Sequence, residues 1–317
     1  MLLLVVIAGI HLTLGDMAIH WSDVLRQEPN LAQQIFWRLR MPRVLAAILV
    51  GASLGASGAV LQTLLHNPLA EPGLLGISSG ASLTAVSVMV LSAMAGWQVP
   101  VWGITGAALV GALVVAVILF TLARRYTLNA GVLLLFGVVI GIIAGAGLTW
   151  LLYFSPTQNL RQLLYWMMGS LSFANTQVYR LWPLFLVVFA LLLRDGAALN
   201  FILLGERYAF SLGIDVRKVR SRLVLWVALM SAIAVACAGS ISFIGLLVPH
   251  LLRYWLGDEQ RQLIWMSTLG GAIAVLGADI LAMSLLNGAE LPIGVITASV
   301  GGPLLFILLL RQHHVAH

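Results

Sequence analysis

Long apolar runs, separated by short polar breaks, fill this sequence from end to end. Of its 317 residues, 61% are hydrophobic and only 9% are charged, whereas soluble domains carry about a quarter charged residues. An apolar run of about 20 residues is long enough to cross a bilayer as a helix, and backbone groups inside a bilayer must hydrogen-bond within the spanning element. We therefore expect an all-α polytopic membrane protein, with one transmembrane domain over residues 1–317.

Ten apolar windows account for most of the chain. They lie at residues 1–14, 44–65, 73–94, 99–123, 131–154, 177–193, 223–242, 243–256, 262–286 and 291–310. The sequence thus predicts about ten transmembrane helices. The first window is too short to cross alone and lacks the basic flank of a signal peptide, which favours a natural start further upstream over a trimmed helix.

The basic residues fit a role in membrane topology. The 17 Lys and Arg residues are scattered over loop ends and never form a run, so the pattern does not indicate nucleic-acid binding. When the windows are assigned to alternate sides, most basic residues fall on the side that carries residues 195–222. The positive-inside rule then places this loop and the C-terminus in the cytoplasm, and residues 15–43 outside it.

Two segments interrupt the apolar pattern with helix breakers. The stretch HNPLAEPGLLGISSGASL occupies residues 66–83, and GSISFIGLLVPHLLR occupies residues 239–253. Paired interruptions in the two halves of a membrane protein point to a translocation path. Tight helix packing by small residues is the alternative explanation.

The residues that would carry chemistry are missing or dispersed. Cys237 is the only cysteine, and no pair of histidines has metal-ligand spacing within a predicted helix. The only lysine, Lys218, precedes Val219, whereas a phosphate-binding P-loop needs Gly-Lys-Ser/Thr. We therefore expect neither an enzyme nor a cofactor in this chain.

Asp279 is the one acidic residue well inside a predicted span. Charge at that depth is costly and often functional. Two roles remain open, namely proton or sodium coupling and a hydrogen-bonded structural carboxylate, and the second is favoured.

The loop at residues 195–222 combines basic residues with an apolar turn. Its core GERYAFSLGID places Tyr208, Ala209, Phe210 and Leu212 between two glycines, which fits a short amphipathic helix with a glycine stop. Apolar side chains exposed outside the bilayer suggest a protein partner.

Five extended motifs, found in order along nearly the whole chain, resemble those of the FecCD-type permeases of type II ABC importers. They are HNPLAEPGLLGISSGASL, RQLLYWMMGSLS at 161–172, LLGERYAFSLGIDV at 203–216, FIGLLVPHLLR at 243–253 and AELPIGVITASVGGP at 289–303. Within the family, NPLAEPGLLG and YFSPTQNLRQLLYWMMG are most similar to the cobalamin (vitamin B12) permeases.

The resemblance implies a fold, partners and a location. It implies the type II importer permease fold, a homodimer in the bacterial inner membrane, two ATPase subunits on the cytoplasmic face and a periplasmic substrate-binding protein. ATP and Mg would bind to the ATPase, so no cofactor belongs to this chain, and membrane lipid would surround it.

The resemblance also implies roles for particular residues. Gly76, Ser78, Ser79 and Gly80 would line the translocation pathway between the two subunits. The core of the 195–222 loop would form the coupling helix that contacts the ATPase. The coupling residues would be Gly205, Glu206, Tyr208, Ala209, Leu212 and Gly213.

Two further family features are matched in part. Arginines before the second span dock the binding protein, and FWRLRMPR supplies Arg40 and Arg43; interfacial snorkelling is their alternative role. Another docking arginine of the cobalamin permeases falls at Met283. The family's cytoplasmic gate is a Thr-Ser pair, which corresponds here to Ala130 and Gly131.

The sequence therefore predicts the permease subunit of an ATP-driven cobalamin importer. The first alternative is an iron-siderophore or haem permease of the same family. The second is an ion-coupled secondary transporter.

Overall fold

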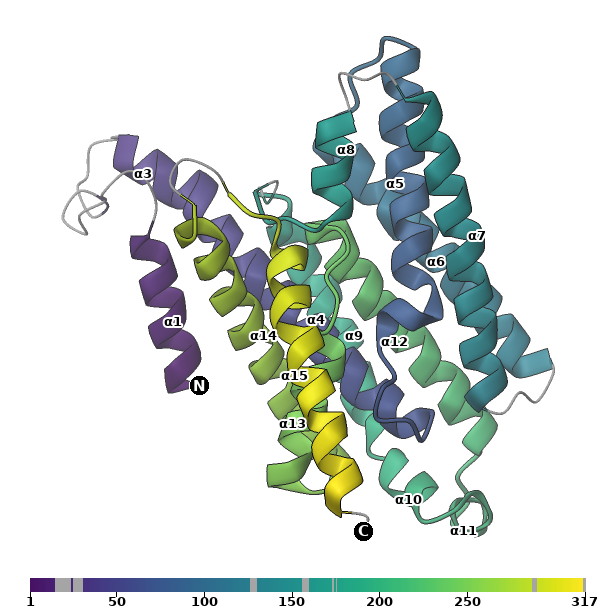
Figure 1. Cartoon of the computed structure of the whole chain (residues 1–317). Helices are drawn as coiled ribbons and strands as arrows, with labels where there is room; N and C mark the ends of the chain where they lie inside the picture. Colours follow the sequence, from purple (N-terminus) through teal and green to yellow (C-terminus); the bar gives the residue numbers. More distant parts are fainter. Residues whose placement is uncertain are drawn as a thin grey trace.

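The computed structural model describes residues 1–14, 24, 31–125, 130–155, 160–172, 174, 176–286 and 290–315 (Figure 1). Within these ranges the regular elements are helices. The ten apolar helices are α1 Leu2–Thr13, α4 Met41–Leu64, α5 Ile77–Met94, α6 Val101–Arg125, α7 Ala130–Phe154, α9 Val178–Gly196, α12 Val216–Ala238, α13 Ile244–Leu256, α14 Gln260–Ser284 and α15 Ile293–Val315. Shorter elements are α3 Leu31–Ile35, η1 Phe36–Arg40, η2 Pro72–Leu75, α8 Leu160–Met167, α10 Leu199–Leu203 and α11 Glu206–Ser211.

The expected membrane architecture is confirmed. Seven helices are long and apolar enough to cross a membrane, and three shorter apolar helices, which include α1 and α13, accompany them. In Figure 1 the helices run broadly along one direction; α10, α11 and the C-terminal end of α15 lie at the bottom, and α3 and α8 lie at the top.

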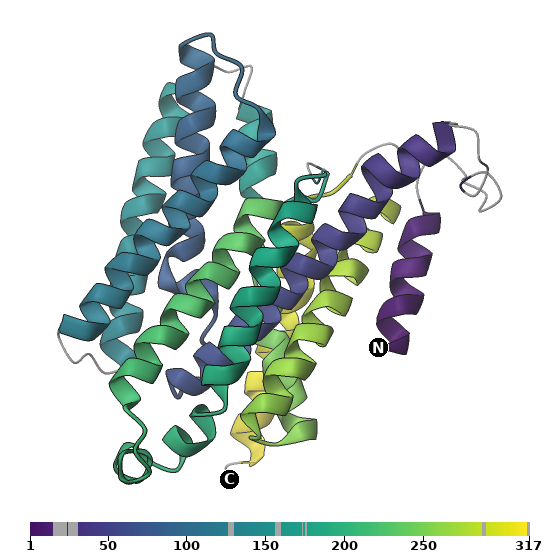
Figure 2. The same ribbon diagram turned by 180° about the vertical axis from the view of Figure 1, so that it is seen from behind.

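Helix α4 is the centre of the bundle. Its apolar window is 89% buried, and it packs against α12, α13 and α14. Figure 2 shows α4 between α9 and α14, with α5, α6 and α7 grouped on the far side of α12. This burial explains why its sequence GASLGASGA is built from small residues.

Glycines let the α4 backbone approach its neighbours closely. A Cβ on Gly51 would collide with the Gly271 carbonyl of α14, and one on Gly58 would collide with the Gly245 carbonyl of α13. In lipid, close backbone packing of this kind is a main source of helix association. The small residues therefore specify which helices α4 contacts.

The two interrupted segments of the sequence meet in the structure. Within the first break, Gly76 precedes α5 and has a φ of +69°; within the second, Phe243 precedes α13 and has a φ of +68°. The Phe243 amide donates a 3.1 Å hydrogen bond to Oε2 of Glu71. Glu71, an acidic residue of the first break, thus caps the start of α13. This hydrogen bond joins the first break to the second.

Candidate functional site

Helix α11 is a short amphipathic turn at the bottom of the molecule. It is bounded by Gly205, with φ of +120°, and Gly213, with φ of +81°. Residues other than glycine rarely adopt these backbone conformations. The chain then turns back, since the Ile214 amide donates to the Ala209 carbonyl at 3.0 Å. The predicted short helix with a glycine stop is therefore present.

The apolar side chains of this segment divide into two groups. Phe210 is 77% exposed, and Tyr208 and Leu212 are each 51% exposed. Leu204, just before the helix, is 68% exposed. We call these four residues the apolar tip. Ala209, by contrast, is fully buried, so its predicted contact with a partner is corrected to a packing contact within the chain.

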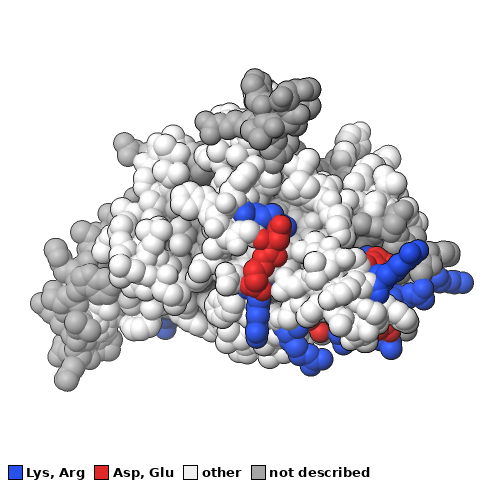
Figure 3. Space-filling model, turned by 90° about the horizontal axis from the view of Figure 1, so that it is seen from below, with Lys and Arg blue, Asp and Glu red and all other residues white. Residues whose placement is uncertain are grey.

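Charged side chains surround the apolar tip. Figure 3 shows the lower face, where the coloured side chains are mostly blue and gather on the side where α11 lies in Figure 1. Arg207, Arg217 and Lys218 are exposed, and Arg220 of α12 pairs with Glu206 of α11 at 2.7 Å. An apolar centre with a charged rim has the composition of a protein interface.

The glycines at the start of α5 contact other helices of the same chain. A Cβ on Gly76 would lie 2.7 Å from the Gly137 carbonyl of α7, and one on Gly80 would overlap the Val115 side chain of α6. These two glycines thus pack against helices of the same subunit, and their lining role stays a prediction. Ser78 and Ser79 are half-buried, and their lining role stays a prediction.

Enlarging Gly80 and enlarging Ser79 should have different effects. Gly80→Leu should lower the yield of folded protein, because overpacking costs about 1–3 kcal/mol or more. Ser79→Trp should leave the fold intact and reduce solute uptake. Size-exclusion chromatography measures the first effect, and uptake into proteoliposomes measures the second. A well-folded Gly80→Leu variant would contradict the packing assignment.

The predicted gate residues lie at the start of α7. Ala130 is its first residue, and Gly131 follows as an exposed residue. The chain before them, at 126–129, lies outside the described residues. Their gating role stays a prediction.

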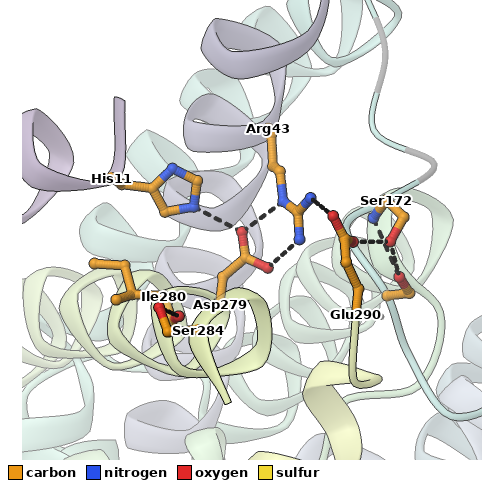
Figure 4. Close-up of polar contacts among 8 residues, drawn as sticks. His11, Arg43, Ser172, Asp279, Ile280, Ser284 and Glu290 are labelled. Atoms are coloured by element: carbon orange, nitrogen blue, oxygen red, sulfur yellow. Dashed lines mark hydrogen bonds and ion pairs between the residues drawn. The ribbon is translucent and has the colours of Figure 1, made fainter. Parts of the chain in front are cut away.

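The predicted docking arginines make contacts within the chain, and Figure 4 shows those of Arg43. The Arg43 guanidinium makes two 2.8 Å bonds to the Asp279 carboxylate and one to Oε1 of Glu290. His11 Nε2 lies 2.7 Å from the same Asp279 carboxylate. Arg40 is buried and donates to the Leu12 carbonyl at 2.7 Å.

Neither of the predicted docking arginines presents an exposed guanidinium to a partner. Arg43 is paired with two carboxylates, and Arg40 is hydrogen-bonded to the end of α1. Arg38, which lies inside the FWRLRMPR motif, and Arg180 of α9, which lies outside it, are exposed near the same end. Exposure is a tertiary property, which is why the motif could not show which arginines are available to a partner.

Asp279 is fully buried and paired. Its carboxylate is hydrogen-bonded to His11 of α1 and to Arg43 of α4. The geometry therefore agrees with the favoured role, a hydrogen-bonded structural carboxylate. No local pattern in the sequence indicates these partners, because His11 and Arg43 are 268 and 236 residues away from Asp279 along the chain. Within the described residues, no group of three or more His, Cys, Asp and Glu side chains is arranged to hold a metal ion.

Comparison with known proteins gives consistent matches. The profile of the FecCD transport family matches residues 2–311. The vitamin B12 import system permease protein BtuC of Vibrio cholerae is 42% identical over 96% of this chain and 90% of its own. The protein of the same name from Yersinia pseudotuberculosis is 44% identical over 95% and 88%.

Solved structures match as well. An ABC transporter described as being of the metal-chelate type, in an inward-facing conformation, superimposes with a TM-score of 0.86 and 30% identity over 98% of this chain and 97% of that one. PsaBC from Streptococcus pneumoniae, at 17% identity and a TM-score of 0.53 over 90% of this chain and 93% of its own, shares the fold alone.

Proposed function

This chain belongs to the FecCD transport family, and from that premise we propose that it is the transmembrane permease subunit of an ATP-driven importer of vitamin B12. It is a transporter subunit rather than an enzyme. The observation that carries the choice of solute is the similarity to relatives named as vitamin B12 import permeases, at 42–44% identity across 95–96% of the chain.

The proposed complex contains three kinds of protein contact. Two copies of this chain form a homodimer in the inner membrane, surrounded by lipid. Two ATPase subunits, which bind ATP and Mg, sit on the cytoplasmic face, and a periplasmic binding protein delivers the solute on the other face. In support, the apolar tip is exposed on the side of the molecule that carries most of the described basic residues.

We further propose where the solute passes. Ser78 and Ser79 start α5 beside the first break and present small polar side chains. The solute path would run past them between the two subunits, and the start of α7 at Ala130 and Gly131 would close its cytoplasmic end. The exposed Arg38 and Arg180 are better placed than Arg40 and Arg43 to meet carboxylates of the binding protein.

One observation favours a second candidate solute. The structural match described as metal-chelate type covers 98% of the chain, so a chelated metal is the alternative cargo. Ion-coupled transport is less well supported, because the Asp279 carboxylate that would serve it is already occupied by Arg43 and His11.

Uptake into proteoliposomes tests the proposal. The permease is reconstituted with ATPase and binding-protein partners, and labelled cyanocobalamin and a labelled ferric siderophore are supplied separately. We expect cobalamin to accumulate only with ATP inside and the binding protein outside. Accumulation of the iron chelate alone would support the second solute, and uptake driven by a proton or sodium gradient without ATP would overturn the proposal.

A further inference from the structure

Helix α13 is held by polar side-chain contacts at both of its ends. It spans 13 residues, which corresponds to about 20 Å at 1.5 Å per residue. Its upper, N-terminal end follows Phe243, and its lower, C-terminal end is joined by residues 257–259 to the start of α14.

At the lower end, four residues form a closed ring of hydrogen bonds, which we call the polar ring. Arg253 of α13 donates to the Asp258 carboxylate and to the Thr63 hydroxyl, both at 3.1 Å. Thr63 of α4 donates to Oε1 of Gln260 at 2.6 Å, and Nε2 of Gln260 donates to the Asp258 carbonyl at 2.9 Å. Gln260 is fully buried and Thr63 is 3% exposed.

Asn200 connects the polar ring to the segment that carries the apolar tip. Its Nδ2 donates to Oε1 of Glu259 at 3.1 Å, and its Oδ1 accepts the Gln260 amide at 2.9 Å. Asn200 belongs to α10, which ends at Leu203 next to the tip residue Leu204. Both hydrogen bonds end on the first turn of α14, so one amide side chain fixes α10 against the ring.

Glu259 is an ionised acceptor in this arrangement. Burial alone would raise its pKa, but hydrogen bonds from the Gln262 amide, Asn200 and the Arg261 amide lower the pKa below its usual value. Its carboxylate caps α14 at the same time. Ionised acceptors make stronger hydrogen bonds than neutral ones.

At the upper end, α13 is held by residues of the first break and of α4. The Phe243 amide donates to Glu71, as described above, and Nε2 of Gln62 donates to the Leu246 carbonyl at 2.9 Å. Phe243 has a positive φ of +68°, which is costly for a bulky side chain and persists only where the surroundings impose it. The start of α13 is thus fixed to Glu71 of the first break and to Gln62 of α4.

We propose that Asn200 is a positioning residue for transport, and that it transmits movement of the ATPase-facing segment through the polar ring to α13 and so to the two breaks. This inference rests on the proposed function. Asn200 is hydrogen-bonded to the Gln260 amide, and Gln260 is joined through Thr63 to Arg253, so a displacement of α10 moves Gln260 and Arg253 with it. Helix α13 then carries the displacement to Phe243 and Glu71.

The test compares ATP hydrolysis with uptake in the same proteoliposomes. Asn200→Ala removes both hydrogen bonds, and we expect the ATP hydrolysed per cyanocobalamin imported to rise by about tenfold, within the range of typical coupling between sites. The amount of assembled complex should not change. This ratio does not depend on how much protein is folded, which separates positioning from general stability.

A polarity swap provides the rescue. Asn200→Asp alone places a second carboxylate beside Glu259 and should also uncouple the transporter. Combining it with Glu259→Gln restores the hydrogen bond between positions 200 and 259 with donor and acceptor reversed, while the Arg261 amide loses its acceptor. The ratio should therefore return part of the way to the wild-type value. Arg194→Ala is the matched control, because the Arg194 side chain is 71% exposed and belongs to neither the polar ring nor the rim of the apolar tip.

A second readout does not depend on which solute is carried. In a Cys237→Ala background, Ser242→Cys places a thiol in the second break. We expect a non-hydrolysable ATP analogue to change its rate of reaction with a water-soluble maleimide, and Asn200→Ala to abolish that change. If cobalamin is not imported but this response is seen, the proposed solute fails and the inference stands.

Three results would overturn the inference. The first is an Asn200→Ala variant with the same ATP ratio as Arg194→Ala. The second is a thiol response unaffected by Asn200→Ala, and the third is the absence of a nucleotide response when Asn200 is unchanged. If Asn200→Ala does not assemble, Thr63→Val decides the question, since it opens the ring at a buried position and should raise the ratio in the same way.

Discussion

Arg43→Met should destabilise the folded protein more than any other single change in the polar cluster of Figure 4. The substitution leaves the fully buried Asp279 carboxylate without its main counter-charge. Breaking a buried ion pair from one side costs about 3–5 kcal/mol. The expected result is a large fall in the midpoint of thermal unfolding, measured for the purified protein in detergent.

The partner substitution tests the cause of this loss. Asp279→Asn removes the buried charge and keeps the shape of the side chain, and Arg43 still pairs with Glu290. The midpoint of thermal unfolding should therefore fall less than in Arg43→Met. The double variant Arg43→Met with Asp279→Asn should unfold at a higher temperature than Arg43→Met alone. If the two changes are additive, the ion pair does not explain the stability. If Arg43→Met unfolds like wild type, the cluster is not structural.

Phe210→Asp should abolish association with the ATPase and leave the permease folded. Phe210 is 77% exposed, so its replacement removes little packing within the chain. Truncating or charging an apolar residue at the centre of an interface costs about 2 kcal/mol or more, and each 1.4 kcal/mol is about tenfold in affinity. We therefore expect a rise of at least about thirtyfold in the Kd for the ATPase.

Two control variants separate the interface from the fold. Ala209→Asp changes the neighbouring residue, which is fully buried, and should reduce the yield of folded permease. Arg217→Ala removes an exposed charge at the rim and should mainly alter the rate and salt dependence of association. A Phe210→Asp variant that binds the ATPase like wild type would exclude the apolar tip as the contact surface.

Some of these features could be predicted from the sequence. The apolar windows anticipated the ten helices, since the hydrophobic length of a span is a local property. Gly205 and Gly213 predicted where α11 begins and ends, because their backbone conformations are set locally. The motifs anticipated the family, since they are contiguous stretches of chain.

What only the tertiary structure decided is the environment of each side chain. Arg43 and Asp279 are 236 residues apart, and no local pattern shows that they pair. Ala209 and Phe210 are adjacent and both apolar, yet one is buried and the other exposed. Whether a residue belongs to an apolar run, a helix or a motif depends on its neighbours along the chain. Whether its side chain is buried, paired or exposed depends on which distant helices pack together, and the small residues of α4 decide which helices can come close.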